Sequence, residues 1–158
     1  MASAIITTAF GNLQINSTKT GVTELFFTEK EATYESISDA IIKTAVKQIS
    51  EFIEHKRTVF DIPLNLNGTP FQRSVWKSVH NIPYGTTISY LRIAQQLGDT
   101  KKVRAVANAI GKNPVLLLIP CHRVVGSDGK LIGYSGGIER KRLLLAHEGY
   151  PFQNSLFS

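Results

Sequence analysis

The sequence has a single cysteine and no long apolar run. One cysteine cannot form an internal disulfide, so we expect a reducing compartment: the cytoplasm, or the nucleus if the host is a eukaryote. A cysteine-based structural zinc site is not expected either, because such sites usually need at least two thiolates. No apolar stretch approaches the roughly 18–20 residues that cross a membrane. The N-terminal residues also lack the basic-then-apolar pattern of a secretory signal, so we expect none.

Acidic residues are scarce in the second half of the chain. Residues 1–68 hold 6 Lys+Arg and 8 Asp+Glu, whereas residues 69–158 hold 12 Lys+Arg and only 4 Asp+Glu. A strongly basic half joined to a mildly acidic one suggests that the basic half contacts a polyanion. From charge alone, a solvated basic surface without a partner is an equal alternative.

The first half reads as a small α/β domain over residues 1–64. The apolar, β-branched stretches AIITTAF (4–10) and TELFF (23–27) predict strands, with FGNL (10–13) as a turn. From Ser36 to about Lys56, apolar residues recur every three or four positions and predict an amphipathic helix. These residues are Ile37, Ile41, Ala45, Ile49, Phe52 and Ile53. Residues 65–68 are predicted to be a linker.

The second half, over residues 69–150, reads as a series of short helices. Thr69 followed by Pro70 predicts the start of one helix. The further elements expected are helices at Tyr90–Leu97, Lys101–Ile110 and Ile138–His147, a buried strand at 114–120, and a Gly-rich turn region at 126–137. The pair of helices joined at Gly98 is a helix-turn-helix pattern, and its second helix is basic. Residues 151–158 are expected to be a C-terminal tail.

The single cysteine lies in IPCHRVV (119–125), between a proline and a histidine. A cysteine attacks an electrophile as the thiolate, which needs a cationic or basic neighbour, and His122 and Arg123 are candidates. Glu148 is a candidate to orient the histidine. Adjacent residues on an extended strand point to opposite faces, so pairing Cys121 with His122 requires a turn in this motif or a bridging water. The alternative is a buried cysteine that packs as a small hydrophobe.

Three other positions carry weaker signals. YSGG (134–137) would let a backbone approach a ligand closely and offers the Ser135 hydroxyl, although the residues alone favour a plain Gly-rich turn. Tyr90, at the start of a predicted helix, reads as a core residue. Asn113, just before a proline, reads as a turn residue.

Taken together, these motifs resemble one known family. IPCHRVV, preceded by NPV and followed by YSGG and LLAHEG, is similar to the O6-alkylguanine-DNA alkyltransferases, also called methylated-DNA–protein-cysteine methyltransferases. The stretch VWKSVHNIPYGTTISYLRIA resembles the entry to the DNA-binding domain of that family. The resemblance covers roughly residues 69–150. It implies a mixed α/β (α+β) protein: a small ribonuclease-H-like N-terminal domain followed by a mainly helical winged-helix domain that carries the cysteine.

The activity implied by the resemblance is DNA repair by irreversible transfer of an alkyl group to the protein itself. Cys121 would accept the group from O6 of guanine, or less readily from O4 of thymine, without a cofactor. His122, acting through a water, would ionise Cys121, and Glu148 would orient His122. Tyr90 would donate a proton to the departing guanine, and Asn113 would tie the recognition element to the active-site strand.

The resemblance also implies substrate and DNA contacts. The partner would be alkylated double-stranded DNA, bound by a monomer through the minor groove without regard to sequence. The substrate-binding residues implied are Ser135, Tyr134, Pro120 and Val124. The DNA-binding residues implied are Arg104, which would fill the gap left by the extruded nucleotide, together with Ala105, Ala107, Lys102 and Arg123. Many relatives have glycine at the position of Ala107, and some bind zinc through cysteines that this chain lacks, so we predict no metal.

Two other classes of protein stay open on the residues. One is a cysteine hydrolase that uses Cys121, His122 and Glu148, and it would differ by multiple turnover. The other is a non-catalytic helix-turn-helix regulator, in which Cys121 would be dispensable.

Overall fold

The computed structural model describes residues 1–33 and 38–151, and it divides the chain into two compact units. The first unit contains Met1–Thr69 together with Asn113–Ile119, and the second contains Pro70–Lys112 and the described residues from Pro120 onward. The sequence assigns 113–119 to the second domain, whereas the contacts of these residues group them with the first unit. Of the predicted tail, only Pro151 is described. None of the described helices is both long and apolar enough to span a membrane.

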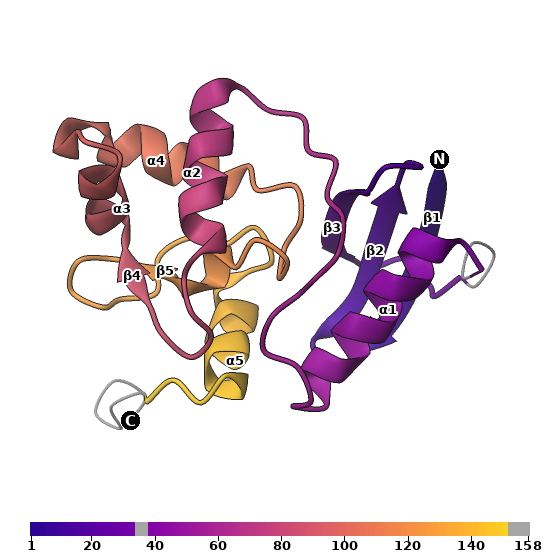
Figure 1. The fold of residues 1–158 in the computed structure, drawn as a ribbon. Helices are drawn as coiled ribbons and strands as arrows, with labels where there is room; N and C mark the ends of the chain where they lie inside the picture. Colours follow the sequence, from indigo (N-terminus) through magenta and orange to yellow (C-terminus); the bar gives the residue numbers. More distant parts are fainter. Residues whose placement is uncertain (34–37, 152–158) are drawn as a thin grey trace. The chain divides into compact units, whose positions relative to one another are not determined.

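The first unit is an antiparallel sheet covered by one helix (Figure 1). Strands β1 (Ala2–Thr8), β2 (Gly11–Ser17) and β3 (Val22–Thr28) pair in that order, and helix α1 (Ala40–Ile53) packs on β1 and β2. Alternate residues of each strand point to one face of a sheet, and here they meet the apolar face of the helix. The core formed in this way contains Ala4, Leu13, Ile15, Leu25, Ile42, Ala45, Ile49 and Phe52, all buried.

Two predictions for this unit need correction. The segment FGNL is not a turn, because Gly11–Leu13 already belong to β2 and the chain reverses one step earlier. The predicted helix is present but begins at Ala40, where the Asp39 carboxylate accepts hydrogen bonds from the first turn. Ser36 and Ile37, which the sequence placed in this helix, lie outside the described residues.

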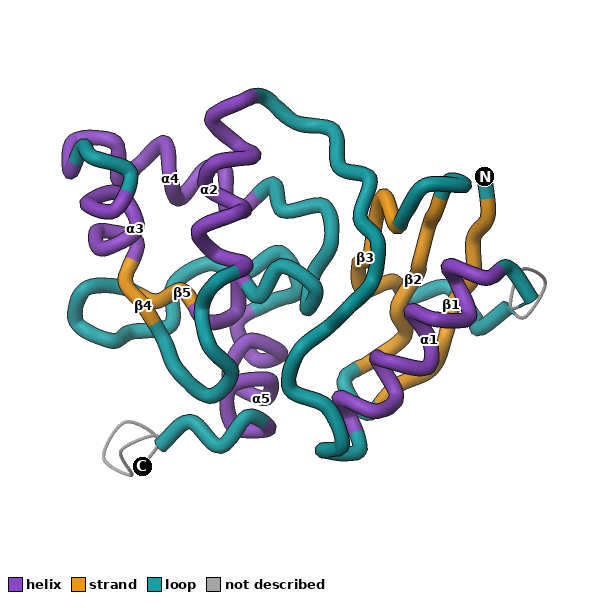
Figure 2. Tube along the Cα trace, viewed as in Figure 1, coloured by secondary structure: helices purple, strands orange, loops and turns teal. Residues whose placement is uncertain are grey.

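The second unit is mainly helical and agrees with most of the predicted boundaries. Its elements are α2 (Pro70–His80), β4 (Ile88–Ser89), α3 (Tyr90–Gln96), a 3-10 turn (Thr100–Lys102), α4 (Val103–Gly111), a second 3-10 turn (Cys121–Arg123), β5 (Val124–Val125) and α5 (Ile138–His147). Ser89 caps α3 by accepting a hydrogen bond from the Arg92 amide, and Asp99 caps the first 3-10 turn by accepting one from the Lys101 amide. Figure 2 shows the long loop between β5 and α5.

The apolar run PVLLLIP is not the strand that its composition predicts. Only its first residues pair with β3, through Leu25 N–H to Pro114 O and Leu116 N–H to Leu25 O, each 2.9 Å. The chain then turns at Leu117, whose φ of 71° is rare for a branched residue. The Asn113 side chain supports this turn by hydrogen bonding to Ile119 O and the Val115 amide. The run is buried, as expected, but as a folded loop.

Candidate active site

Cys121 begins a single 3-10 turn, and this is the turn that pairing it with His122 requires. The Arg123 amide closes the turn on Pro120 O at 2.9 Å. The following residues, Val124 and Val125, are extended and pair in parallel with Ile88 and Ser89. This short ladder brings the start of α3 close to the cysteine turn. Cys121 is buried and lines a pocket of about 360 Å³.

The carboxylate of Glu148, just past α5, holds the residues that follow the cysteine. Its Oε2 lies 2.6 Å from His122 Nε2, and both side chains are fully buried. Arg123 donates two further hydrogen bonds of 2.8 Å to the same carboxylate, and the Gly85 amide donates one of 3.0 Å. Burial alone would raise the pKa of Glu148, but the hydrogen bonds from His122 and Arg123 lower it to about 2. The carboxylate is therefore ionised near neutral pH.

The protonation of His122 follows from its surroundings. Burial lowers the pKa of His122, and the positive charges of Arg123 and Lys141 act in the same direction, against the opposing effect of Glu148. The imidazole is therefore neutral near pH 7. An ionised carboxylate can only accept hydrogen bonds, so Nε2 carries the proton toward Glu148 and Nδ1 keeps its lone pair. Nδ1 has no hydrogen-bond partner among the described residues, which leaves it available as a base.

One wall of the Cys121 pocket is built from Tyr90 and the loop after β5. The Tyr90 hydroxyl donates to Ile132 O at 2.9 Å, and burial, followed by the nearby Cys121, raises its pKa to about 12. Ser135 and Tyr134 also line the pocket. Ser135 is exposed, whereas the Tyr134 hydroxyl is buried without a partner among the described residues. Burial raises the pKa of Tyr134 as well.

Helix α4 forms the remaining wall, and exposed basic residues lie on it and on the 3-10 turn that precedes it. Arg104 and Ala107 both line the pocket and both are exposed, so they lie at its mouth. Lys102 and Ala105 are exposed too, and the Lys102 Nζ lies 5.5 Å from the centre of the Phe71 ring. These four residues therefore lie where a ligand outside the pocket could contact them.

Three assignments of site residues are corrected by the geometry. Arg123 is not a surface residue for DNA, because it is buried and its guanidinium is bonded to Glu148 and to Ile82 O. Pro120 and Val124 are buried and do not line the Cys121 pocket, so neither is placed to contact a substrate there.

The sequence reading missed Lys141, which is fully buried in α5. Its Nζ donates to Ile132 O at 2.9 Å and to Gly133 O at 3.0 Å, and lies 3.5 Å from the Tyr90 hydroxyl. Burial lowers its pKa to about 8, although the nearby Cys121 acts in the opposite direction. A signal for it exists in the sequence: Lys141 precedes Leu144 and Leu145 by three and four residues, which places it on the buried face of the helix.

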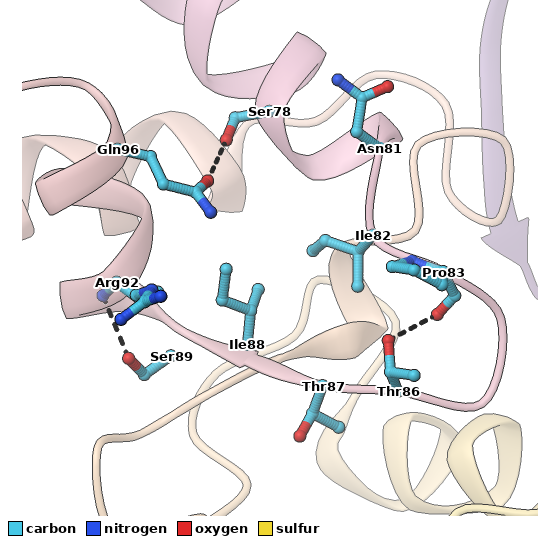
Figure 3. A pocket seen from close by; sticks show the side chains of 10 residues that line it. All are labelled: Ser78, Asn81, Ile82, Pro83, Thr86, Thr87, Ile88, Ser89, Arg92 and Gln96. Carbon is cyan, nitrogen blue, oxygen red and sulfur yellow. Dashed lines mark hydrogen bonds between the residues drawn. The ribbon is translucent and has the colours of Figure 1, made fainter.

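The larger concavity of the second unit is a separate one. It measures about 710 Å³ and lies between α2, the loop before β4, and α3 (Figure 3). Ile82, Pro83 and Ile88 line it together with polar side chains, and its one charged residue is Arg92. It contains no cysteine, histidine or carboxylate, so the chemistry lies at the smaller pocket. Across residues 1–33 and 38–151, no three His, Cys, Asp or Glu side chains gather as a metal site.

The fold and the site together define a class of protein: a helix-turn-helix domain with a buried cysteine beside the second helix and a buried His–Glu pair behind it. Comparison with known proteins names the family. Residues 70–150 match the 6-O-methylguanine DNA methyltransferase DNA binding domain, and residues 1–66 match the ribonuclease-like domain of the same family. The chain belongs to the 6-O-methylguanine DNA methyltransferase family.

Individual relatives agree with this assignment. A methylated-DNA–protein-cysteine methyltransferase of Mycolicibacterium paratuberculosis is 50% identical over 104 residues, which are 66% of this chain and 63% of that protein. One from Methanosarcina barkeri is 38% identical over 149 residues, covering 91% and 94% of the two chains. The crystal structure of Mycobacterium tuberculosis OGT in complex with DNA is 39% identical, with a TM-score of 0.82 over 98% of each chain. The first of these alignments spans less than two thirds of the relative.

Proposed function

We propose that this protein repairs alkylated DNA by moving the alkyl group from O6 of guanine onto its own Cys121. The observation that carries the proposal is the Cys121–Arg123 turn, which places the cysteine in a pocket and its histidine neighbour on Glu148 at 2.6 Å. The relatives named above bear a matching activity in their names. O4-alkylthymine would be a poorer substrate of the same kind.

In the proposed reaction, the Cys121 sulfur forms a bond to the alkyl carbon as the bond from that carbon to O6 breaks. The thiol proton passes through a water to His122 Nδ1, and the bonding electrons of the C–O bond remain on the guanine. Glu148 then stabilises the protonated imidazole, because it is an ionised acceptor at Nε2. A neutral base held by a carboxylate suits this step, since its lone pair is free near neutral pH.

The guanine that leaves must gain a proton, and we propose Tyr90 as its donor. The Tyr90 hydroxyl lines the pocket and now donates to Ile132 O, so we propose that it turns this proton to guanine N3 when the base is bound. The Ser135 hydroxyl and the adjacent backbone would hydrogen-bond O6, and Tyr134 would form part of the wall. Asn113 is a positioning residue, because it fixes the loop that leads into the cysteine turn.

The DNA partner is inferred from the α4 surface. A base stacked in a duplex cannot reach a buried thiol, so the nucleotide must be flipped out, at a cost of a few kcal/mol. Exposed Arg104 lies on α4 beside the pocket mouth, and exposed Lys102 lies in the 3-10 turn just before it, where phosphate contacts would give affinity for any sequence. We propose that a monomer binds double-stranded DNA through the minor groove, with Arg104 filling the gap left by the flipped nucleotide.

Cys121→Ser tests this function against its two alternatives. We expect the variant to bind a duplex containing O6-methylguanine as tightly as the unchanged protein, and to transfer nothing. Transfer that survives the substitution would exclude Cys121 as the acceptor. A wild-type protein that binds DNA without any change in its own mass would favour a helix-turn-helix regulator, and repeated turnover would favour a cysteine hydrolase.

A further inference from the structure

One turn of the loop between α2 and β4 lies against the Glu148 carboxylate. The amide and the hydroxyl of Thr86 both donate to Pro83 O, at 3.2 Å and 2.8 Å, so residues 83–86 form a β-turn (Figure 3). The Gly85 amide, at the third position of this turn, donates to Glu148 Oε1 at 3.0 Å. The turn does not line the cysteine pocket, yet it contacts the carboxylate that orients the active-site histidine.

The same loop also contacts the cation of the buried cluster. Ile82 O accepts a hydrogen bond of 2.8 Å from Arg123, and the centre of the Tyr84 ring lies 5.6 Å from the Arg123 guanidinium carbon. Tyr84 is half-buried, whereas the side chains of Arg123 and Glu148 are buried. The Tyr84 ring is therefore the partly exposed group that covers this ion pair.

The turn needs glycine at position 85. The φ of Gly85 is 76°, the value that the third residue of a type II turn adopts and that strains a residue with a side chain. A side chain at this position favours a type I turn, in which this φ is negative and the preceding peptide faces the other way. The amide of residue 85 would then point away from Glu148. A Cβ at Gly85 would also lie 3.1 Å from Glu148 O.

Backbone groups of this loop hold both members of the ion pair. Arg123 and Glu148 are joined by two hydrogen bonds of 2.8 Å, but two bonded side chains could still shift together. The Gly85 amide holds the carboxylate and Ile82 O holds the guanidinium, and neither of these is on a flexible side chain. The loop therefore fixes the pair as a unit, with Glu148 Oε2 on His122.

We propose that the 83–86 turn is a positioning element for alkyl transfer. The Gly85 amide keeps the Glu148 carboxylate on His122. The Tyr84 ring keeps water away from the ion pair behind that histidine. This inference rests on the proposed function, and it gives the loop between α2 and β4 a task in the reaction although no residue of the turn touches the substrate.

A displaced turn should change the base as well as the fold. Burial is the main cause that lowers the pKa of His122; Arg123 and Lys141 act in the same direction and Glu148 acts against them. Water admitted beside the pair would relieve the burial and raise this pKa toward its ordinary value of 6.5. More of the imidazole would then be protonated in mild acid, where it cannot accept the thiol proton.

The experiment measures single-turnover transfer from a saturated O6-methylguanine duplex between about pH 5 and about pH 8. In Gly85→Ala, we expect the rate to fall about tenfold at the acid end and much less at the alkaline end, because the base is lost to protonation. Gly129→Ala is the matched control. Gly129 has a similar φ of 81°, but an added Cβ there meets nothing within 4 Å. It strains the backbone in the same way and should leave the shape of the profile unchanged.

Two substitutions of Tyr84 test the ring separately and keep the proposal testable if Gly85→Ala does not fold. Tyr84→Leu removes the ring from Arg123 and should slow transfer in mild acid by about threefold. Tyr84→Phe keeps the ring and should restore the profile of the unchanged protein. Imidazole NMR of His122 gives a readout that does not depend on transfer, and its titration midpoint should rise in Gly85→Ala and in Tyr84→Leu.

The opposite results overturn the inference. A rate that falls by the same factor at every pH, in step with the loss of folded protein in urea, would show that the turn has only a structural role. An unmoved His122 midpoint, or a Tyr84→Phe variant as impaired as Tyr84→Leu, would overturn it too. If the midpoint moves as expected but the unchanged protein transfers no methyl group from DNA, the proposed function is contradicted instead.

Discussion

The buried cluster of Glu148, His122 and Arg123 carries charge, and so does the exposed surface at α4. The two regions differ in whether those charges are paired. Every oxygen of the Glu148 carboxylate is bonded, to His122, to Arg123 or to the Gly85 amide. By contrast, Lys102 and Arg104 are exposed and form no ion pair with the described residues. Buried charges are costly unless fully paired, whereas exposed ones remain available to a partner and are screened by salt.

This difference assigns the two regions different tasks. The cluster has a single arrangement, which fixes the tautomer of His122 and the turn at Cys121. Among the described residues, Lys102 and Arg104 form no ion pair, which suits the proposed contact with phosphates at any sequence. Substitutions in the cluster should therefore affect both stability and chemistry, while those on α4 should affect only the encounter with DNA.

The largest effect is expected for Glu148→Gln. The variant keeps the shape of the side chain but leaves the Arg123 guanidinium buried without its counter-charge, which should cost about 3 kcal/mol of unfolding free energy. Loss of the oriented base should also slow transfer by about a hundredfold. Urea unfolding and single-turnover rates measure the two effects.

Glu139→Gln is the matched control for this prediction. Glu139 pairs with Arg142 on the surface of α5, where the ion pair is exposed to solvent. We expect no measurable change in stability or rate. If Glu148→Gln behaves like Glu139→Gln, the cluster has no special role.

Arg104→Ala should give the next largest effect, and only on duplex DNA. If Arg104 supplies about 1.4 kcal/mol toward holding the nucleotide extruded, its loss slows duplex repair about tenfold. Reaction with free O6-benzylguanine, which needs no extrusion, should be nearly unchanged. Equal losses on both substrates would point to damage to the pocket itself.

Acid should destabilise the cluster and leave the α4 charges untouched. His122 and Glu148 both have a lower pKa in the folded protein than the ordinary values of 6.5 and 4.5. Each of the two groups therefore makes its full contribution to stability at a pH above its ordinary pKa. This contribution is lost as the pH falls toward the pKa of the group in the folded protein. We expect the unfolding free energy to drop below about pH 6.5 and further between pH 4.5 and the Glu148 value of about 2. A stability profile that is flat from pH 7 to pH 3 would contradict the assignment.

The smallest effect is expected for Lys102→Ala. Loss of one phosphate contact should reduce the slope of log K against log salt concentration by about one, equally for all sequences. Transfer from a saturated complex should not change. Lys47→Ala, on α1 of the first unit, is the control and should leave the slope as it is.

An element of this fold can be predicted from the sequence when the interactions that form it join residues close together in the chain. The helix starts at Pro70 and Tyr90 and the turn at Cys121 follow from adjacent residues, and the structure has them. The conformation of PVLLLIP could not be predicted in this way, because the strand that it pairs with, β3, lies far earlier in the chain. Composition indicates that such a run is buried, but not whether it is extended.

The errors at the site have the same cause. The resemblance implies that Arg123 contacts DNA, but its partner Glu148 is far away in the sequence, and only the fold brings the two together. Lys141 lies between two other basic residues, Arg140 and Arg142, which draw no attention to it, although its helical position marks it as buried. Cys121, His122 and Glu148 could be predicted from the sequence, because the resemblance carried by IPCHRVV and LLAHEG names all three residues together.

The central claim is that Cys121 accepts one alkyl group and is then spent. Intact-mass spectrometry of the protein with excess O6-methylguanine duplex tests this most directly. The account predicts that every molecule gains the mass of one CH2 group, located on the Cys121 peptide, and that DNA repaired equals protein supplied. Repair that continues beyond one equivalent, or a modified peptide that lacks Cys121, would contradict it.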